Sequence, residues 1–275
     1  MRKGSKILIS VGCAMLALGI VLVLIGGLTN GGFGLRPKES QQVKALEKTV
    51  EEPFSDIEVV EVSADVELRP AADGKCRISY SESERDPLEI RVKNGKLSLV
   101  RKSSKGNHLF FFSFGFNSQK MDSTVLYLPP SVCQTLHVET VSGSIQLASS
   151  LPVETVELST VSGSIQARDL TPKRLSLESV SGSLVLEEVR ADEKISCETT
   201  SGDIRLTCCD AQELALESVS GDITAELLTA KQIHTDTVSG DVNAPSAQNA
   251  NGTCRAETVS GDITIKLRNS SALTP

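Results

Sequence analysis

The sequence predicts an all-β protein: a parallel β-solenoid of about seven regular coils of 19–21 residues, preceded by about two irregular coils and one transmembrane helix. A Ser-Gly motif, first met as ETVSGSI at residues 139–145, occurs seven times at spacings of 19 to 21 residues. Apolar and polar residues alternate on both sides of each motif, as they do in strands with one buried face. A charge-free stretch near the N-terminus predicts the helix.

That charge-free stretch, residues 7–28, is the first element. Its 22 residues are enough to cross the roughly 30 Å apolar core of a bilayer as a helix. Arg2, Lys3 and Lys6 precede it, and positive charge stays on the cytoplasmic side. We therefore expect a single-pass protein of the cell membrane, with residues 1–6 in the cytoplasm and the solenoid outside the cell. A cleaved signal peptide is the alternative.

Residues 29–53 form the second element, a linker that begins with a glycine-containing stretch. Val43, Leu46 and Val50 would share one face of a helix. The spacing predicts a short helix that caps the exposed end of the solenoid, with a solvated spacer as the alternative.

Residues 54–130 are the third element, two irregular coils interrupted by loops. In IEVVEVSADVEL, Ala64 can occupy the glycine position of the repeat, and in LEIRVKNGKLSL, Gly95 can do the same. Both alignments place apolar residues at the inward positions. The alternative is a separate small β-domain.

Residues 131–268 are the regular coils, and residues 269–275 are a tail. Each coil reads as a strand, a Ser-Gly turn, a second strand and a looser return. Stacked coils bury the apolar side that one coil cannot bury alone. We expect the glycine to adopt a backbone conformation that is costly for a residue with a Cβ atom. In sequence order the last coil ends the stack, where Lys266 and Arg268 would protect its open edge. The turn glycines are Gly143, Gly163, Gly182, Gly202, Gly221, Gly240 and Gly261.

These features together resemble a known bacterial family. The membrane anchor, SDIEVVEVSADVEL, NGKLSL, LYLPPSV and the serial turns such as TVSGDI are similar to those of the putative adhesins, also called domain of unknown function 4097. The resemblance covers about residues 54–268. It implies a membrane-anchored β-solenoid at the cell envelope and no catalytic residues.

Two columns of acidic residues are the first candidate site. The outward position four residues before the glycine is mostly glutamate, and the position directly after the glycine changes from serine to aspartate along the chain. Like charges on neighbouring strands repel, which favours a bound cation, a cationic peptide or a basic protein surface. The alternative is that the aspartates cap backbone N–H groups in the turns and the glutamates are solvated. The candidate residues are Glu198, Glu217, Asp203, Asp222, Asp241 and Asp262.

The second candidate site is the stretch NHLFFFSFGF at residues 107–116. From Arg91 to Lys120 the chain holds seven basic residues and no acidic one. Aromatic residues beside cations suit contact with an anionic membrane or an envelope polymer. The alternative is an apolar plug that closes one end of the solenoid. The candidate residues are Phe110, Phe111, Phe112, Phe114 and Phe116.

The charge distribution argues against nucleic acid as a partner. The net charge is −7, and residues 131–268 alone carry a net charge of about −10 by counting the side chains, whereas binding phosphates requires a cationic face. The three histidines lie far apart in the sequence, with no catalytic triad, metal-ligand spacing or phosphate loop. We therefore predict no catalytic residue, no cofactor and no metal site.

The sequence favours a non-catalytic module that binds or senses at the cell envelope. Its expected partners are the membrane, through residues 7–28, and a cationic peptide, an envelope polymer or a membrane protein. A structural spacer that only holds a partner away from the membrane is the alternative. A glycan-active enzyme with a β-helix fold is a third hypothesis.

Overall fold

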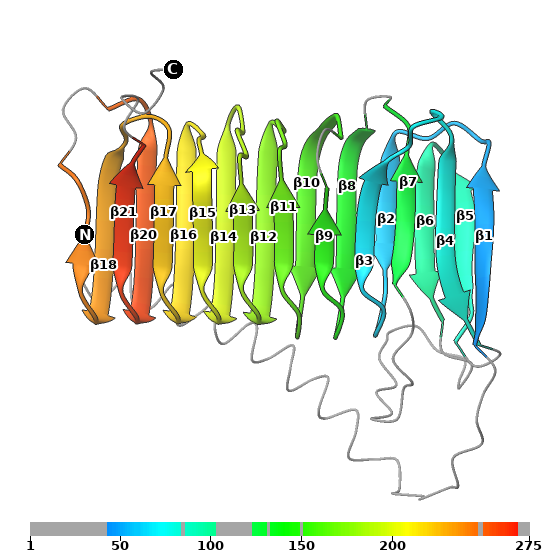
Figure 1. Cartoon of the computed structure of the whole chain (residues 1–275), viewed down its shortest axis with the longest axis horizontal. Coiled ribbons are helices and arrows are strands. Elements are labelled where there is room, and N and C mark those ends of the chain that lie inside the picture. Colours follow the sequence, from blue (N-terminus) through cyan, green and yellow to red (C-terminus); the bar gives the residue numbers. More distant parts are fainter. Residues whose placement is uncertain are drawn as a thin grey trace, which may run out of the picture.

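The computed structural model describes residues 43–83, 86–102, 123–130, 133–148, 151–246 and 250–268. In these ranges the chain folds into two long β-sheets that face each other along one axis (Figure 1). No helix in these ranges has the length and apolar character to span a bilayer. The predicted transmembrane segment 7–28 lies outside them.

Sheet A has eleven strands and sheet B has ten. In spatial order, sheet A contains β1 (Lys44–Val50), β4 (Cys76–Glu82), β7 (Thr124–Leu128), β3 (Val66–Pro70), β9 (Ile145–Leu147), β11 (Ile165–Arg168), β13 (Leu184–Glu187), β15 (Ile204–Cys209), β17 (Ile223–Leu227), β21 (Ile263–Leu267) and β19 (Val242–Asn243). Sheet B contains β18 (Gln232–Ser239), β20 (Thr253–Ser260), β16 (Glu213–Ser220), β14 (Lys194–Ser201), β12 (Arg174–Ser181), β10 (Val153–Thr160), β8 (Cys133–Thr140), β2 (Asp56–Val60), β6 (Lys96–Arg101) and β5 (Leu88–Lys93).

Each repeat is one coil, with its first strand in sheet B and its second in sheet A. We number the coils 1 to 7 in chain order, from β8 and β9 to β20 and β21. Neighbouring coils pair in parallel with equivalent residues side by side, for example Leu177 with Cys197 and Leu184 with Ile204. Inward residues such as Leu216 are fully buried, because a parallel stack keeps every inward position inside. The predicted parallel solenoid is present.

The coil glycines are required by close packing. A Cβ atom on Gly202 would lie 2.2 Å from the carbonyl oxygen of Gly182, and the other six coil glycines face a carbonyl oxygen at 1.9–2.2 Å in the same way. From Gly143 to Gly221 none has φ in the left-handed region. The expectation of a special backbone conformation is therefore wrong for these five. The turns stack so closely that no side-chain carbon fits between them.

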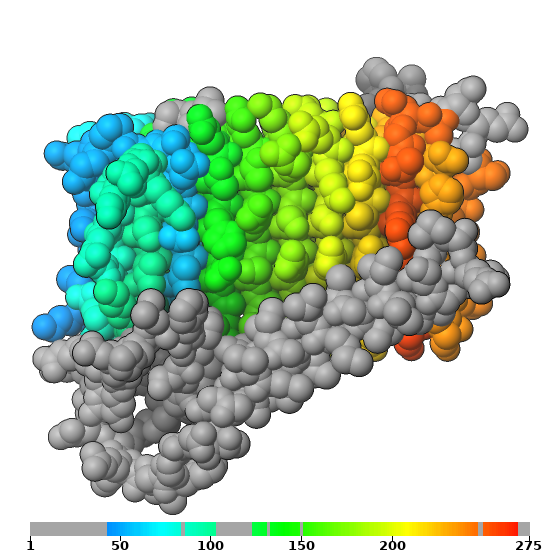
Figure 2. Space-filling model, turned by 180° about the vertical axis from the view of Figure 1, so that it is seen from behind, coloured from blue at the N-terminus to red at the C-terminus, as the bar shows by residue number. Residues whose placement is uncertain are grey.

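The coils do not stack in sequence order. Strand β20 pairs with β16 on one side and with β18 on the other, so coil 7 lies between coil 5 and coil 6. Figure 2 shows the red-orange coil 7 between yellow coil 5 and orange coil 6. Coil 6 ends the stack, so the expectation that the last coil in sequence does so is wrong. Strand β19 covers β21 over two residue pairs, up to Thr264, so the predicted role of Lys266 and Arg268 at that edge stays a prediction. Coil 6 has Thr235 where coil 7 has buried Ala256, so it loses less apolar burial at an end.

The upstream strands join the same two sheets. Strands β2 and β3 form a coil directly beside coil 1, and β6 and β7 form the next coil outward. Ala64 occupies the glycine position as predicted, because its carbonyl faces Gly143. Gly95 does not. It follows Asn94 in the tight turn of the antiparallel β5–β6 hairpin, and both residues have positive φ.

The end of the stack opposite coil 6 is closed by antiparallel strands. The helix predicted around residues 43–50 is wrong. Residues 44–50 form β1, which pairs with β4 over seven residue pairs (Figure 1). The spacing of Val43, Leu46 and Val50 fits a helix, but the edge of β4 offers hydrogen-bond partners to an extended chain. The segment does cover an end of the stack, as a strand instead of a helix.

Candidate functional site

The outer face of sheet B carries a row of carboxylates, which we call the acidic ladder. The predicted residues Glu198 on β14 and Glu217 on β16 are direct neighbours. Glu178 on β12 adjoins Glu198, and Glu257 on β20 adjoins Glu217. Asp236 on β18 follows Glu257. The out-of-order coil therefore exchanges the last two members but keeps five acidic residues in one unbroken row.

The centre of the ladder has an unfavourable electrostatic environment. Partial burial, and then the charge of Glu178, raise the pKa of Glu198 above its ordinary value. Partial burial, followed by the charges of Glu198 and Glu257, raises the pKa of Glu217. Both carboxyl groups therefore hold their protons more strongly than an isolated glutamate does. A cation bound there would relieve this repulsion.

The cations near Glu178, Glu198 and Glu217 are each paired with another carboxylate. Lys194 pairs with Glu213 at 2.9 Å, and Arg174 pairs with Glu193 at 2.7 Å. Arg255 bonds to Glu257 at the far end. Within the described residues, Glu178, Glu198 and Glu217 form no ion pair. The residues two positions before and after these three on the same face are small: Ser176, Ser196, Ala215, Val180, Thr200 and Val219. The three carboxylates thus lie in a strip of small side chains on the outer face of sheet B.

The aspartate column has a structural use. The carboxylate of Asp203 accepts a hydrogen bond from the backbone N–H of Asp222 at 3.1 Å. Asp222 accepts one from Asp262, and Asp262 accepts one from Asp241, each at 2.8 Å. Asp65 does the same for Ser144. These bonds join the turns of neighbouring coils, which is the turn-capping alternative that the sequence left open.

The five candidate phenylalanines lie outside the described residues. The structure does show where their segment joins the fold. Strand β6 ends at Arg101 and β7 begins at Thr124, each parallel to the strands that flank Ala64 in the next coil. Residues 103–122 are thus inserted at the position where the regular coils make their Ser-Gly turns.

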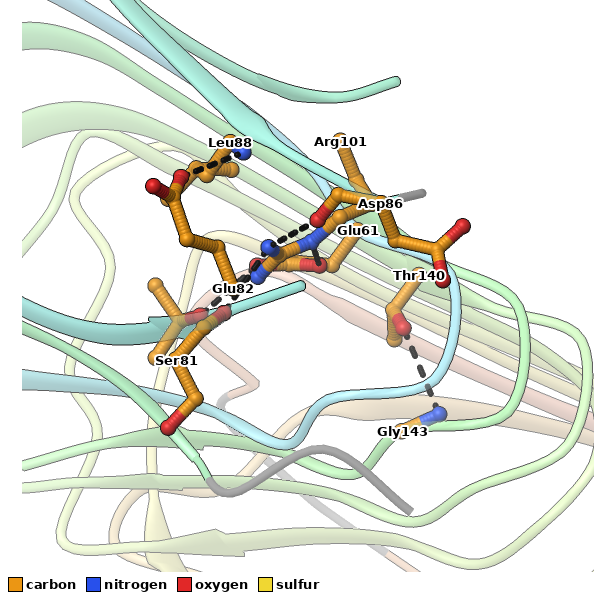
Figure 3. Close-up of polar contacts among 9 residues, drawn as sticks. Glu61, Ser81, Glu82, Asp86, Leu88, Arg101, Thr140 and Gly143 are labelled. Carbon is orange, nitrogen blue, oxygen red and sulfur yellow. Dashed lines mark hydrogen bonds and ion pairs between the residues drawn. The ribbon is translucent and has the colours of Figure 1, made fainter. Parts of the chain in front are cut away.

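At the base of this insertion is a buried ion pair that sequence reasoning missed (Figure 3). Arg101 contacts Glu61 through two hydrogen bonds, at 2.9 and 2.7 Å. Thr124 donates a third hydrogen bond to Glu61 at 2.6 Å, and Arg101 also donates to the backbone oxygens of Ser81 and Asp86. Glu61 is 1% exposed. This network joins both ends of the insertion to the neighbouring coil.

The signal for this pair was present in the sequence. Glu61 lies three residues before Ala64, and the regular coils have threonine or serine at that inward position. In coils 2 to 7 the hydroxyl donates to a glycine carbonyl of a neighbouring coil, as Thr160 does to Gly143 at 3.0 Å. A charged residue in a column of small hydroxyl residues indicates a special partner.

A second polar cluster surrounds His137 on the outer face of sheet B. Its imidazole contacts Glu139 at 2.9 Å and Glu157 at 3.2 Å. The hydrogen bond to Glu139, followed by the charges of Glu139 and Glu157, raises the pKa of His137. His137 in turn lowers the pKa of Glu139. Glu139 lies four residues before Gly143, the ladder position of coil 1, so the carboxylate of that coil has a hydrogen-bonded imidazole partner, unlike Glu198 and Glu217.

This cluster predicts a pH-dependent stability. Because the pKa of His137 is raised in the folded state, its ion pairs stabilise the fold below the unfolded-state value of about 6.5 and are lost as pH rises through the folded value. The His137→Gln variant should therefore unfold at a lower temperature than wild type at pH 5.5, and at the same temperature at pH 8.5. Thermal unfolding followed by circular dichroism tests this. An equal difference at both pH values would show that the imidazole acts only by packing.

The described residues contain no cluster of three or more potential metal-ligating side chains.

A search of curated proteins found no match. The crystal structure of a putative adhesin from Bacteroides fragilis NCTC 9343 is similar, with a TM-score of 0.52 and 19% identity over 83% of this chain and 98% of that one. A putative adhesin from Parabacteroides merdae ATCC 43184 gives a TM-score of 0.48 and 14% identity, over 84% of this chain and 98% of that one. A putative lipid binding protein from Parabacteroides distasonis ATCC 8503 gives 0.47 and 18%, over 82% and 97%.

At such identities the Bacteroides structure shows a shared fold and nothing further. The family comparison is stronger, because the model described as Toastrack DUF4097 matches residues 54–274. That range contains the two upstream coils, all seven regular coils and both acidic columns. The chain belongs to the Toastrack DUF4097 family.

Proposed function

We propose that this chain is a non-catalytic binding module of the bacterial cell envelope, and that its acidic ladder binds a cationic partner. The partner class is a basic peptide or a basic segment of an envelope protein or polymer. The observation that carries this proposal is the row Glu178, Glu198 and Glu217, which form no ion pair within the described residues and lie among small side chains on the outer face of sheet B. A folded cationic surface or an extended basic strand would fit such a strip.

The proposed placement has residues 7–28 in the cell membrane, residues 1–6 in the cytoplasm and the solenoid outside. Strand β1 runs in the same direction as β7, because each is antiparallel to β4. Lys44 and Thr124 therefore lie at the same edge of sheet A, near the same end. We therefore propose that the edge of sheet A that holds Lys44 and Thr124 faces the membrane, with the acidic ladder farther along the two sheets.

The Glu198→Gln/Glu217→Gln variant tests the ladder. The probe is a fluorescent hexalysine peptide, titrated with the full chain in nonionic detergent and measured by fluorescence anisotropy. Exposed ion pairs contribute about 0.2–1 kcal/mol each, so the loss of two should weaken binding about fivefold. Wild-type affinity should also fall as salt is added. Because the two carboxylates repel their neighbours, the variant should be at least as heat-stable as wild type.

The matched control is Glu154→Gln/Glu187→Gln. It also removes two negative charges, but from glutamates that are paired with Lys173 and Arg168. If the ladder is the site, the affinity for hexalysine should therefore change less than twofold. Equal weakening by both variants would reduce the effect to net charge. A wild-type chain that does not bind hexalysine would favour a structural spacer, a role for which the internally bonded aspartate column provides independent support.

A further inference from the structure

The two ends of the solenoid are finished differently. At the end near β1 and β5, both sheets terminate in antiparallel strands that carry exposed charges such as Lys48 and Arg91. Charged edge strands resist pairing with other chains. At the other end, sheet B of the described chain stops at β18, which is eight residues long and within the described residues pairs only with β20. Its outer edge is a row of backbone donors and acceptors.

Exposed apolar surface gathers at this same end. Among the described residues, the exposed large hydrophobic side chains are Val238, which is 65% exposed, and Val242, which is 46% exposed. Both belong to coil 6, on either side of Gly240. The equivalent inward position to Val242 in coil 7 is Ile263, which is fully buried. Coil 6 therefore has the surface of a coil that lacks a neighbour.

We infer that the neighbour is a second copy of this chain, paired with β18 through its own β18 across a two-fold axis. A two-fold axis makes identical edge strands antiparallel. It also requires inward residues to lie opposite inward residues, since a one-residue slip would turn every side chain to the wrong face. The two-fold axis must therefore pass beside one residue of β18, and that residue lies opposite the same residue of the second copy.

Charge selects that residue as Thr235. With Thr235 on the axis, His234 of each copy lies opposite Asp236 of the other, which makes two favourable pairs. With Asp236 on the axis, two carboxylates face each other, and with His234 on the axis, two imidazoles do. Directly opposed like charges on paired strands are destabilising, whereas opposite ones stabilise.

The side of β18 that already has a partner strengthens this selection. On β20, His234 adjoins Arg255, and Asp236 adjoins Glu257. Within one chain the basic His234 thus lies beside a basic side chain, and the acidic Asp236 lies beside an acidic one. Only an antiparallel neighbour reverses that pattern. A second copy supplies it without any other protein.

Disulfide trapping tests the register. Residues directly opposite in an antiparallel pair have Cα atoms about 4.5–5.5 Å apart, within the range that a disulfide needs. The Thr235→Cys full chain in nonionic detergent, treated with a mild oxidant, should form a covalent dimer at least tenfold faster than wild type with its native cysteines. The control Gln232→Cys, also on β18, would lie opposite Val238 and should stay at the wild-type rate.

A charge exchange provides the second test. His234→Asp should weaken dimerisation about tenfold, because four carboxylates would meet. The His234→Asp/Asp236→His double variant restores both pairs and should recover it, as measured by sedimentation and by trapping in the Thr235→Cys background. Equal trapping at positions 232 and 235, failure of the exchange to recover, or capture of a different protein in cells would overturn the proposal.

Discussion

Replacing Arg101 with methionine should destabilise the fold by about 3–5 kcal/mol, the usual cost of breaking a buried ion pair from one side. Glu61 would lose its cationic partner in a site where it is 1% exposed, with the Thr124 hydroxyl as its remaining hydrogen-bond donor among the described residues. Ser81 and Asp86 would also lose the guanidinium that binds their backbone oxygens. Thermal unfolding of the full chain, followed by circular dichroism, measures the loss.

Two variants separate this effect from lost packing. Arg174→Met removes an exposed arginine with a carboxylate partner and should cost less than about 1 kcal/mol. The double variant Glu61→Leu/Arg101→Met removes both charges and should recover most of the loss, since a buried pair and an apolar pair often have similar stability. If the double variant were less stable than Arg101→Met, the pair would contribute through shape instead of charge.

The Gly202→Ala substitution should destabilise the fold by about 3 kcal/mol, at the upper end of the range for overpacking. Its Cβ would lie 2.2 Å from the oxygen of Gly182, and the strands on both sides hold the turns at a fixed distance. Thermal unfolding again measures the effect. The neighbouring Ser201→Ala change, at an exposed position, should stay within about 0.5 kcal/mol of wild type. Equal stability of the two variants would show that the turns can separate.

The solenoid could be predicted because its signals are local and repeated. Each coil contains its own alternation and its own glycine, so the parallel register of residues such as Leu177 and Cys197 followed from aligning the motifs. The acidic ladder could be predicted for the same reason. The role of the glycine could not, because the constraint comes from the carbonyl of a neighbouring coil and has no trace in the φ angle of the residue itself.

The order of the coils depends on competition between similar surfaces, which no single motif records. Coil 6 and coil 7 share nearly the same turn sequence, and the choice between them rests on small differences such as Thr235 against Ala256. The strand at residues 44–50 was missed because an open sheet edge outweighed a weak helical spacing. Glu61 stands out in its column of hydroxyl residues, but its partner Arg101 is 40 residues away, and no local pattern identifies it.

The position of coil 7 also sets an order of events during synthesis. Coil 6 leaves the ribosome first, yet its place in the finished stack is against a strand that has not been made. A coil 6 that docks early on coil 5 occupies the site of coil 7 and has to leave it again. The hydrogen bond between Asp262 and Asp222 spans 40 residues, whereas the equivalent bond between Asp222 and Asp203 spans 19. Docking of the final two coils is thus non-local, as is the pairing of β2 with β8, whereas coils 2 to 5 each stack on the coil made just before them. Since non-local pairing slows folding, we expect the last two coils to be completed late.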